Sequence, residues 1–201
     1  MDYKLADDQL FSAFEAEAQG LLATVGRTEF KNTYRALFGF VFKINSLKTS
    51  LFDCVESGNP YVFRIVFRCL CEHYLKFTHI FMRFLEEKND DAGTDFFAYC
   101  GASEAQEYAK SLNFAEGLIG SEYSTDFDHL VKKYYPKAAN LSVRKLKAKS
   151  AEFRYREILR RLAETRPKLI SKEIPFLASI VPAYAEYSAF VHGGPMAMSS
   201  T

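Results

Sequence analysis

The chain has 201 residues, a net charge of +1 and a composition of 48% hydrophobic and 25% charged residues, which is typical of a globular domain with a sizeable core. No basic segment precedes an apolar run at the start, and no stretch approaches roughly 18 apolar residues. We therefore expect no signal peptide, no membrane span and a cytoplasmic location. With 19 Phe, 12 Tyr and no Trp, the composition favours a thick core between helices.

Helical periodicity dominates the first half of the chain, and strand-like alternation is nearly absent. The pattern predicts helices over about 7–25 and 28–56, and we interpret residues 1–26 as an N-terminal helical appendage. A stop signal at 57–60 then precedes a long helix over about 60–88, with Pro60 suited to its first turn. The wide apolar arc of this last helix predicts that it is central.

The opposite arc of the helix over 60–88 is polar. Successive residues of a helix are rotated by about 100°, and this rotation brings the charged side chains of the segment to one side. The members of this arc are Arg64, Arg68, Glu72, Lys76, His79 and Arg83. One interpretation is a solvated face with a weak Arg68–Glu72 pair. The alternative is a cleft in which Glu72 orients a guanidinium that binds phosphate.

Shorter helices are expected in the second half of the chain. A turn at 89–93 is followed by predicted helices over about 94–100, 103–116, 127–135, 150–165 and 171–192. Ser103 with Gln106 has the spacing of a capping box, and Pro182 predicts a kink in the last helix. The basic stretch 137–149 is poor in large apolar residues, so we expect a mobile loop. Together these elements predict a single all-α domain, residues 1–201, built as a bundle of about seven helices.

Charge is unevenly distributed along the chain. Residues 131–172 contain 14 Lys and Arg against three Glu, a net charge of +11, which leaves −10 for the remainder. This separation indicates a surface that faces a polyanion, or a basic arm that docks on the acidic part of the same or another subunit. A solvated helix face is the third interpretation. The candidate phosphate contacts in this segment are Arg144, Lys145, Lys147 and Lys149.

The four cysteines, Cys54, Cys69, Cys71 and Cys100, have no paired spacing, so free thiols in a reducing compartment are expected. Cys69, Cys71 and His73 alternate at every second position, and a helix would spread such side chains apart. We interpret them as small buried residues rather than as a metal site, and the sequence implies neither a metal nor a cofactor.

One histidine stands at the end of the last predicted helix, before Gly193 and Gly194. Tyr184, Ser188 and His192 follow one another at intervals of four and form a stripe on one helix face. The partial negative charge of a helix C-terminus favours a protonated imidazole there. His192 is thus either a simple helix cap or a titratable acid/base group.

The pair Arg68 and Glu72, with the later Tyr184 or Tyr187, Ser188, His192 and Gly193, resembles the Arg-x3-Glu and Tyr-x3-Ser-x3-His pattern of an uncharacterised bacterial family of helical proteins. That family looks related to the HEPN superfamily of helical nucleotide-binding and ribonuclease domains, which are common in phage defence and in toxins. The similarity extends over about residues 30–195.

The resemblance implies an HEPN-like fold, a homodimer or higher homo-oligomer, and a metal-independent endoribonuclease acting on RNA without a cofactor. His192 would move the proton, with Ser188 or Tyr187 as its polar neighbour. Arg68, held by Glu72, would stabilise developing charge, and Arg64 would bind phosphate. The sequence departs from the superfamily's nuclease motif, which has Arg five to seven positions before His, because positions 185–187 are Ala, Glu and Tyr.

Two other functions remain open from the sequence. The missing arginine favours a non-catalytic oligomerisation or sensor module in a defence system, with a second defence-system protein as a further candidate partner. In this function Arg68, Glu72, Ser188 and His192 form a structural polar network. A sensor that binds a phosphorylated nucleotide along the basic stripe is the third function.

Overall fold

The computed structural model describes residues 2–120, 124–165 and 175–192, and these residues form helices and turns without a β-strand. The all-α expectation is confirmed, with more helical segments than the seven or so expected. The helices are α1 Tyr3–Val25, α2 Lys31–Glu56, α3 Pro60–Glu87, α4 Asp91–Asp95, α5 Gly101–Leu118, α6 Phe127–Tyr134, α7 Val143–Ala151, α8 Tyr155–Thr165 and α9 Pro175–Val191, with a π-helical turn at Phe96–Cys100 and a 3-10 turn at Pro136–Ala138.

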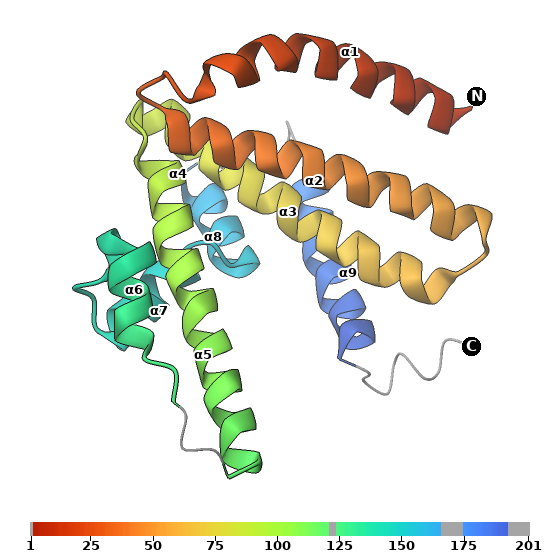
Figure 1. Ribbon diagram of the computed structural model, residues 1–201. Coiled ribbons are helices and arrows are strands. Elements are labelled where there is room, and N and C mark those ends of the chain that lie inside the picture. The colour runs from red at the N-terminus through yellow and green to blue at the C-terminus, as the bar shows by residue number, and fades with distance from the viewer. Residues whose placement is uncertain (1, 121–123, 166–174, 193–201) are drawn as a thin grey trace.

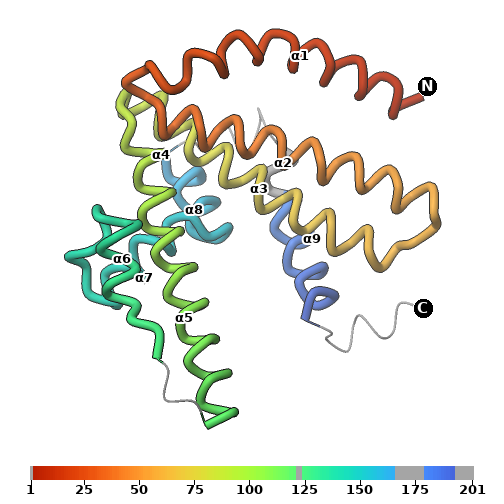
Figure 2. Tube along the Cα trace, viewed as in Figure 1, coloured from red at the N-terminus to blue at the C-terminus, as the bar shows by residue number. Residues whose placement is uncertain are grey.

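The helices α2 and α3 form a long antiparallel hairpin that organises the molecule (Figure 1). Pro60 is the first residue of α3, as predicted, and the side chain of Asn59 caps this helix by accepting from the amide of Val62. The α1 helix lies along α2, while α9 packs on α3 and the free end of α5 projects away from the hairpin (Figures 1 and 2). The hairpin therefore supports α1, α4, α8 and α9 directly, while α5, α6 and α7 pack on one another and on the π-helical and 3-10 turns.

Three apolar clusters fill the spaces between the helices. The first joins α3, α8 and α9, the second joins α2, α3 and α4, and the third joins α5, α6 and α7. Their fully packed members include Leu75, Ile158 and Ile180 in the first cluster, Phe40, Ile80 and Phe153 in the second, and Ala102, Val131 and Leu146 in the third. In α1, by contrast, Ala18 is the buried residue, and Leu5, Leu10 and Leu21 are exposed.

The segment 91–118 runs as one helical rod rather than as the two helices expected. The π-helical turn connects α4 to α5 without a break, so the chain is still helical at Ser103. The predicted capping box is therefore wrong, and Gln106, a residue within the rod, is buried. Since a π turn inserts one extra residue, the apolar phase shifts within the rod, and a single period of 3.6 cannot describe it.

The basic stretch 137–149 is also not a mobile loop. Residues 143–151 form α7, which begins where the hydroxyl of Ser142 accepts from the amide of Lys145. Leu146 is 2% exposed and fixes the helix against the third apolar cluster. One buried leucine thus docks a helix whose other side chains are mostly polar.

The polar arc of α3 is not a single solvated face. His79 and Arg83 are 2% and 7% exposed, and Arg83 donates to Glu87 and to Asp95 of α4 at 2.8 to 3.1 Å. Lys137 reaches the second oxygen of Asp95 at 2.8 Å. In the C-terminal half of the arc, the buried Arg83 is therefore the centre of a partly buried ion-pair network that ties α3 to α4 and to the 3-10 turn.

In the last helix, α9 ends at Val191 and contains Pro182, close to the expected bounds, while the predicted start at 171–174 lies outside the described residues. In the described part of the chain, no helix is both long and apolar enough to cross a membrane.

Candidate functional site

The N-terminal half of the polar arc forms a closed network with α9. Arg68 donates from Nη2 to the hydroxyl of Tyr184 at 2.7 Å, and its guanidinium carbon lies 4.5 Å from the centre of that ring. The same hydroxyl donates to Glu72 at 3.3 Å, and Glu72 also accepts from Lys76 at 2.9 Å. The side chains of Arg68 and Glu72 are 16% and 29% exposed, so the network is half-buried rather than solvated.

Electrostatics hold this network in one ionisation state near neutral pH. Burial alone would raise the pKa of Glu72, but the hydrogen bond and charge of Lys76, with the charge of Arg68, lower it overall. Burial and the neighbouring carboxylate of Glu72 raise the pKa of Tyr184 to about 12. Glu72 is therefore an anion and Tyr184 a neutral donor and acceptor, which matches the hydrogen bonds observed.

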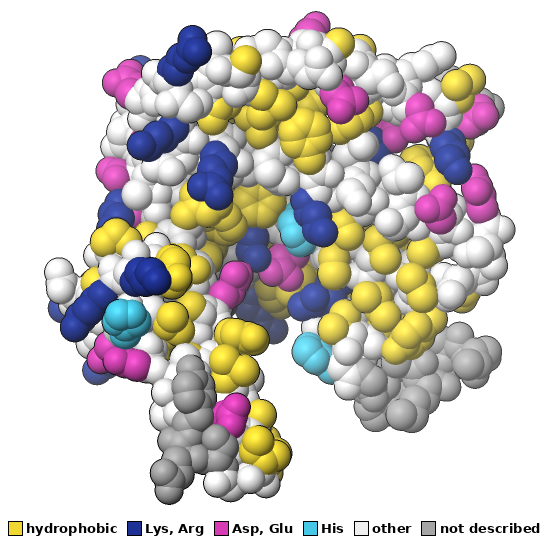
Figure 3. Space-filling view, in the orientation of Figure 1, with side chains coloured by type: hydrophobic (Ala, Val, Ile, Leu, Met, Phe, Trp, Pro, Cys, Tyr) yellow, Lys and Arg dark blue, Asp and Glu magenta, His cyan; other side chains and the backbone are white. Residues whose placement is uncertain are grey.

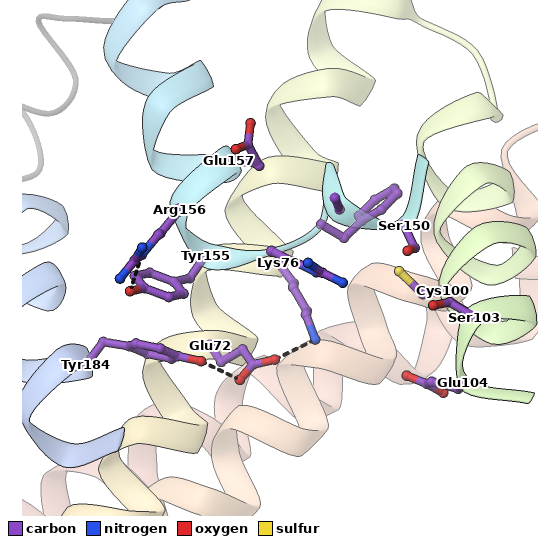
Figure 4. A pocket seen from close by; sticks show the side chains of 13 residues that line it. Glu72, Lys76, Cys100, Ser103, Glu104, Ser150, Tyr155, Arg156, Glu157 and Tyr184 are labelled. Atoms are coloured by element: carbon purple, nitrogen blue, oxygen red, sulfur yellow. Dashed lines mark hydrogen bonds and ion pairs between the residues drawn. The ribbon is translucent and has the colours of Figure 1, made fainter. Parts of the chain in front are cut away.

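A pocket of about 450 Å³ opens beside this network, between α3, α5, α9 and the start of α8. Figure 4 shows Tyr184 between Glu72 and Tyr155, with Lys76 next to Glu72 and Arg156 next to Tyr155. The space-filling view shows the molecule hollowed between α5 and α9, with acidic and basic side chains on the floor (Figure 3). Its size is within the range of pockets that hold small organic ligands.

Two aromatic rings form the wall of the pocket nearest α9. The rings of Tyr155 and Tyr184 stack with their centres 3.9 Å apart and their planes 31° apart. The hydroxyl of Tyr155 accepts from Nε of Arg156 at 2.7 Å, which aims that guanidinium along the wall. Arg154, also on the lining, is exposed and has no ion-pair partner among the described residues.

The histidine expected to act with Arg68 lies elsewhere. His192 follows the last residue of α9 and is exposed, and its side chain forms no hydrogen bond with a described residue. It is eight residues beyond Tyr184, a distance of about 12 Å along a helix. Because α9 runs antiparallel to α3, its end lies near Tyr61, whose hydroxyl donates to the carbonyl of Phe190 at 3.0 Å. Within one chain, His192 and Arg68 are not brought together.

The remaining motif residues of α9 and α3 make packing contacts. Tyr187 packs edge-on against Phe67 with ring centres 5.8 Å apart, and Arg64 lies 4.6 Å over the ring of Phe190. Ser188 is half-buried, and its carbonyl accepts from the amide of His192 at 3.3 Å. Of the predicted catalytic group, the structure therefore unites Arg68 and Glu72, with Tyr184 in the place expected for Ser188 and His192.

The basic segment divides into paired and unpaired cations. Lys137 and Arg161 reach acidic side chains outside the segment, whereas Lys149 and Arg160 pair with glutamates inside it. Seven others in the described part of the segment have no ion pair with a described carboxylate: Lys132, Lys133, Arg144, Lys145, Lys147, Arg154 and Arg156. The docking interpretation thus holds for two cations, and the larger group remains available to solvent.

The cysteines and histidines do not assemble a metal centre in the described residues. All four cysteines are free thiols. Burial raises the pKa of Cys71 to about 11 and that of Cys100, at the edge of the pocket, to about 12. Both are therefore protonated near neutral pH and poor nucleophiles.

Sequence reasoning missed the tyrosine and arginines at the start of α8. Tyr155 and Arg156 lie within the basic segment. The predicted helix began at about residue 150 and placed them in its middle rather than at a helix start. In fact α8 begins at Tyr155, and the preceding turn presents Arg154 to the pocket. Only the position of α8 against α3 and α9 turns these residues into a wall.

Comparisons of the chain with models of protein families, with curated proteins and with solved structures gave no match.

Proposed function

We propose that the protein binds RNA through the unpaired basic side chains of α6, α7 and the start of α8, as an HEPN-like RNA-targeting protein of bacterial phage defence or of the toxin type. The observation that carries the proposal is the set of seven cations without a carboxylate partner among the described residues. Exposed Lys and Arg attract phosphates and release the counterions of the strand when it binds.

The geometry of α7 supports this proposal. Arg144, Lys145 and Lys147 are exposed, while Leu146 holds the helix against the body of the protein. The cations are therefore presented on a fixed helix and not on a flexible arm. A fixed charged surface lowers the cost of ordering side chains when a ligand binds.

The test is the salt dependence of binding to a single-stranded RNA, measured by fluorescence anisotropy with wild type, Lys147→Glu and Lys43→Glu. Lys43 is an exposed lysine of α2 without an ion pair among the described residues, so its variant is matched in charge. Loss of one phosphate contact reduces the slope of log K against log salt by about 0.7 for a single strand. We expect that reduction for Lys147→Glu alone. Equal effects of the two variants, or binding that ignores salt, would contradict the proposal.

Cleavage, if the protein performs it, is assigned to His192 as the acid/base group. Since Arg68 is held by Tyr184 in the same chain, the cationic partner of His192 would come from a second subunit. Purified wild type and His192→Ala are compared for RNA fragments at equal protein concentration. Fragments from wild type alone support the assignment, fragments from both contradict the role of His192, and fragments from neither leave the protein as a binding module.

A second candidate function follows from the closed network of Arg68, Glu72 and Tyr184. Such a network fixes the register of α9 on α3 and favours a non-catalytic oligomerisation or sensor module in which these residues are structural. His192 is outside the network, so its replacement by Ala leaves the melting temperature unchanged in either case. Absence of salt-dependent RNA binding by wild type, together with a loss of stability in Tyr184→Phe, would favour this second function.

A further inference from the structure

Two adjacent tyrosines at the end of α6 have different surroundings. Pro136 disfavours helical backbone at the residue before it, so α6 ends at Tyr134 and the chain turns at Tyr135. The ring of Tyr135 packs against α5 at Gly101, where an added Cβ would collide with it, and it contributes to the third apolar cluster. Tyr134, by contrast, is 60% exposed. One ring therefore anchors the turn, and the other faces solvent.

A cation without a counterion lies over the exposed ring. The ammonium of Lys133 is 5.0 Å from the centre of the Tyr134 ring. Neither Lys133 nor its chain neighbour Lys132 has an ion pair with a described carboxylate. Figure 3 shows basic and hydrophobic side chains next to one another over α6. An open aromatic ring beside unpaired cations is the combination with which proteins hold the bases and the phosphates of a single strand.

The exposed ring also lines a second pocket, of about 690 Å³, between α2, the π-helical turn, α5 and the 3-10 turn. Three further aromatic rings contribute to its lining, those of Phe96, Phe97 and Tyr135. Because Tyr134 is both part of the lining and mostly exposed, it lies at the rim of this pocket. The volume is within the range of pockets that hold small organic ligands, so a planar base has room beside Tyr134.

The polar groups of this pocket suit the edge of a base better than a phosphate. The guanidinium carbon of Arg35 lies 4.9 Å from the centre of the Phe97 ring, and Arg35 has no ion pair with a described residue. Glu104 likewise has no ion pair among the described residues, whereas Lys137 is held by Asp95 at 2.8 Å. A carboxylate in the lining repels a phosphate, but a base edge presents both donors and acceptors.

We propose that an unpaired base of a bound RNA strand stacks on Tyr134 at the rim of this pocket, with its edge toward Arg35 and Glu104. The proposal rests on the proposed function, because the phosphates of the strand lie on the lysines of α6 and α7. Bases of a duplex are already stacked and paired, so only a single-stranded segment gains this contact. Stacking on an aromatic ring depends little on the identity of the base.

The test is fluorescence anisotropy of the full chain with three RNA probes of equal length: a single strand, a duplex, and an abasic strand that keeps the sugar–phosphate backbone. Tyr134→Ala should weaken the single strand by about fivefold or more, the effect of losing one stacked base, and leave the duplex and the abasic strand unchanged. The slope of log K against log salt should stay the same, because no charge is lost.

Two further variants serve as controls. Tyr134→Phe keeps the ring and should bind the single strand as wild type does. Tyr108→Ala removes a tyrosine of α5 that is 66% exposed and does not line the pocket, and it should also bind as wild type does. Circular dichroism of all three variants checks that they are folded.

Two results would overturn the base contact while leaving salt-dependent RNA binding intact. The first is equal affinity of Tyr134→Ala and Tyr108→Ala for the single strand. The second is an equal loss of affinity of Tyr134→Ala for the single strand and for the abasic strand, which would mean that the variant disturbs the phosphate contacts. Failure of wild type to bind any of the three probes would instead overturn the proposed function and, with it, this contact.

Discussion

Asp90 caps the start of α2 from a distant position in the chain: its carboxylate accepts from the amide of Thr33, 57 positions before it, at 2.7 Å. The same side chain also accepts from the amide of Asn32 at 3.2 Å and from the Asn32 side chain at 2.8 Å. The residue before α2, Phe30, offers no side-chain cap of its own. The N-terminus of α2 is thus stabilised by the turn after α3, which locks the hairpin to the rod formed by α4 and α5.

Asp90→Ala should lower the free energy of unfolding by about 2 to 3 kcal/mol, because it removes several partly buried hydrogen bonds and a carboxylate at a helix N-terminus. Urea unfolding followed by circular dichroism measures the change. Asp91→Ala is the control, since Asp91 is exposed and pairs with Lys137 at the surface. An equal effect of both variants would mean that the cap is not the cause.

Gly93→Ala should be among the most destabilising single substitutions in the chain. A Cβ at Gly93 would collide with the backbone of Asn32 and Thr33. Neither α2 nor α4 can move away without losing the Asp90 cap. We expect a cost of about 3 kcal/mol or more from overpacking.

Gly39→Ala provides the opposite control in α2. An added Cβ there meets no atom within 4 Å, and alanine favours the helix by about 0.5 to 1 kcal/mol. Thermal melts of the two alanine variants should therefore move in opposite directions. A similar shift in both would refute the close approach of α4 to α2.

Tyr184→Phe should destabilise the protein by about 1 to 3 kcal/mol, because it leaves Arg68 and Glu72 without a shared partner in a half-buried place. The control is Tyr187→Phe, whose hydroxyl has no hydrogen bond among the described residues. Urea midpoints of the two variants decide the matter, and equal midpoints would show that the network adds no stability.

Stability should fall as the pH drops below about 6.5, because of His79. Burial, with the charges of Arg161 and Arg83, lowers the pKa of His79 to about 3, so the unfolded chain binds a proton that the folded chain does not. The loss between these two values approaches about 1.4 kcal/mol per pH unit. Stability above pH 6.5 is unaffected by this group.

The measurement is urea unfolding at pH 7.5 and pH 5.5 for wild type and His79→Phe. Phe suits a site where the imidazole already packs edge-on against Phe153, with ring centres 5.4 Å apart. The pH dependence in this range should be smaller in the variant. Identical slopes would assign the acid sensitivity to other groups.

Local signals predicted the elements whose ends are marked by the chain itself. The start of α3 at Pro60 and the end of α9 near His192 both follow from proline, glycine and apolar spacing. The signals failed where a distant segment decides the structure. Leu146 makes α7 a helix only because α5 and α6 supply its cluster, and the helical rod continues past Ser103 through a π turn.

The candidate site shows the same division. Spacing placed Arg68 and Glu72 together on one face of the helix over 60–88, and Tyr184 on one face of the last helix. Both placements are correct. Spacing could not determine how far α9 slides along α3, and that register brings Tyr184 rather than His192 to Arg68. Burial of His79 and Arg83 likewise depends on carboxylates and helices from other parts of the chain.

The contact between Tyr184 and Glu72 joins residues 112 positions apart. A ribosome adds residues at about 5 to 20 per second, so roughly 6 to 20 s separate the synthesis of these two side chains. During that interval the charged face of α3 emerges without the helix that covers it. The nascent chain therefore carries an uncovered Arg68 and Glu72 until α9 emerges. Packing of α9 on this face of α3 is one of the last steps of co-translational folding.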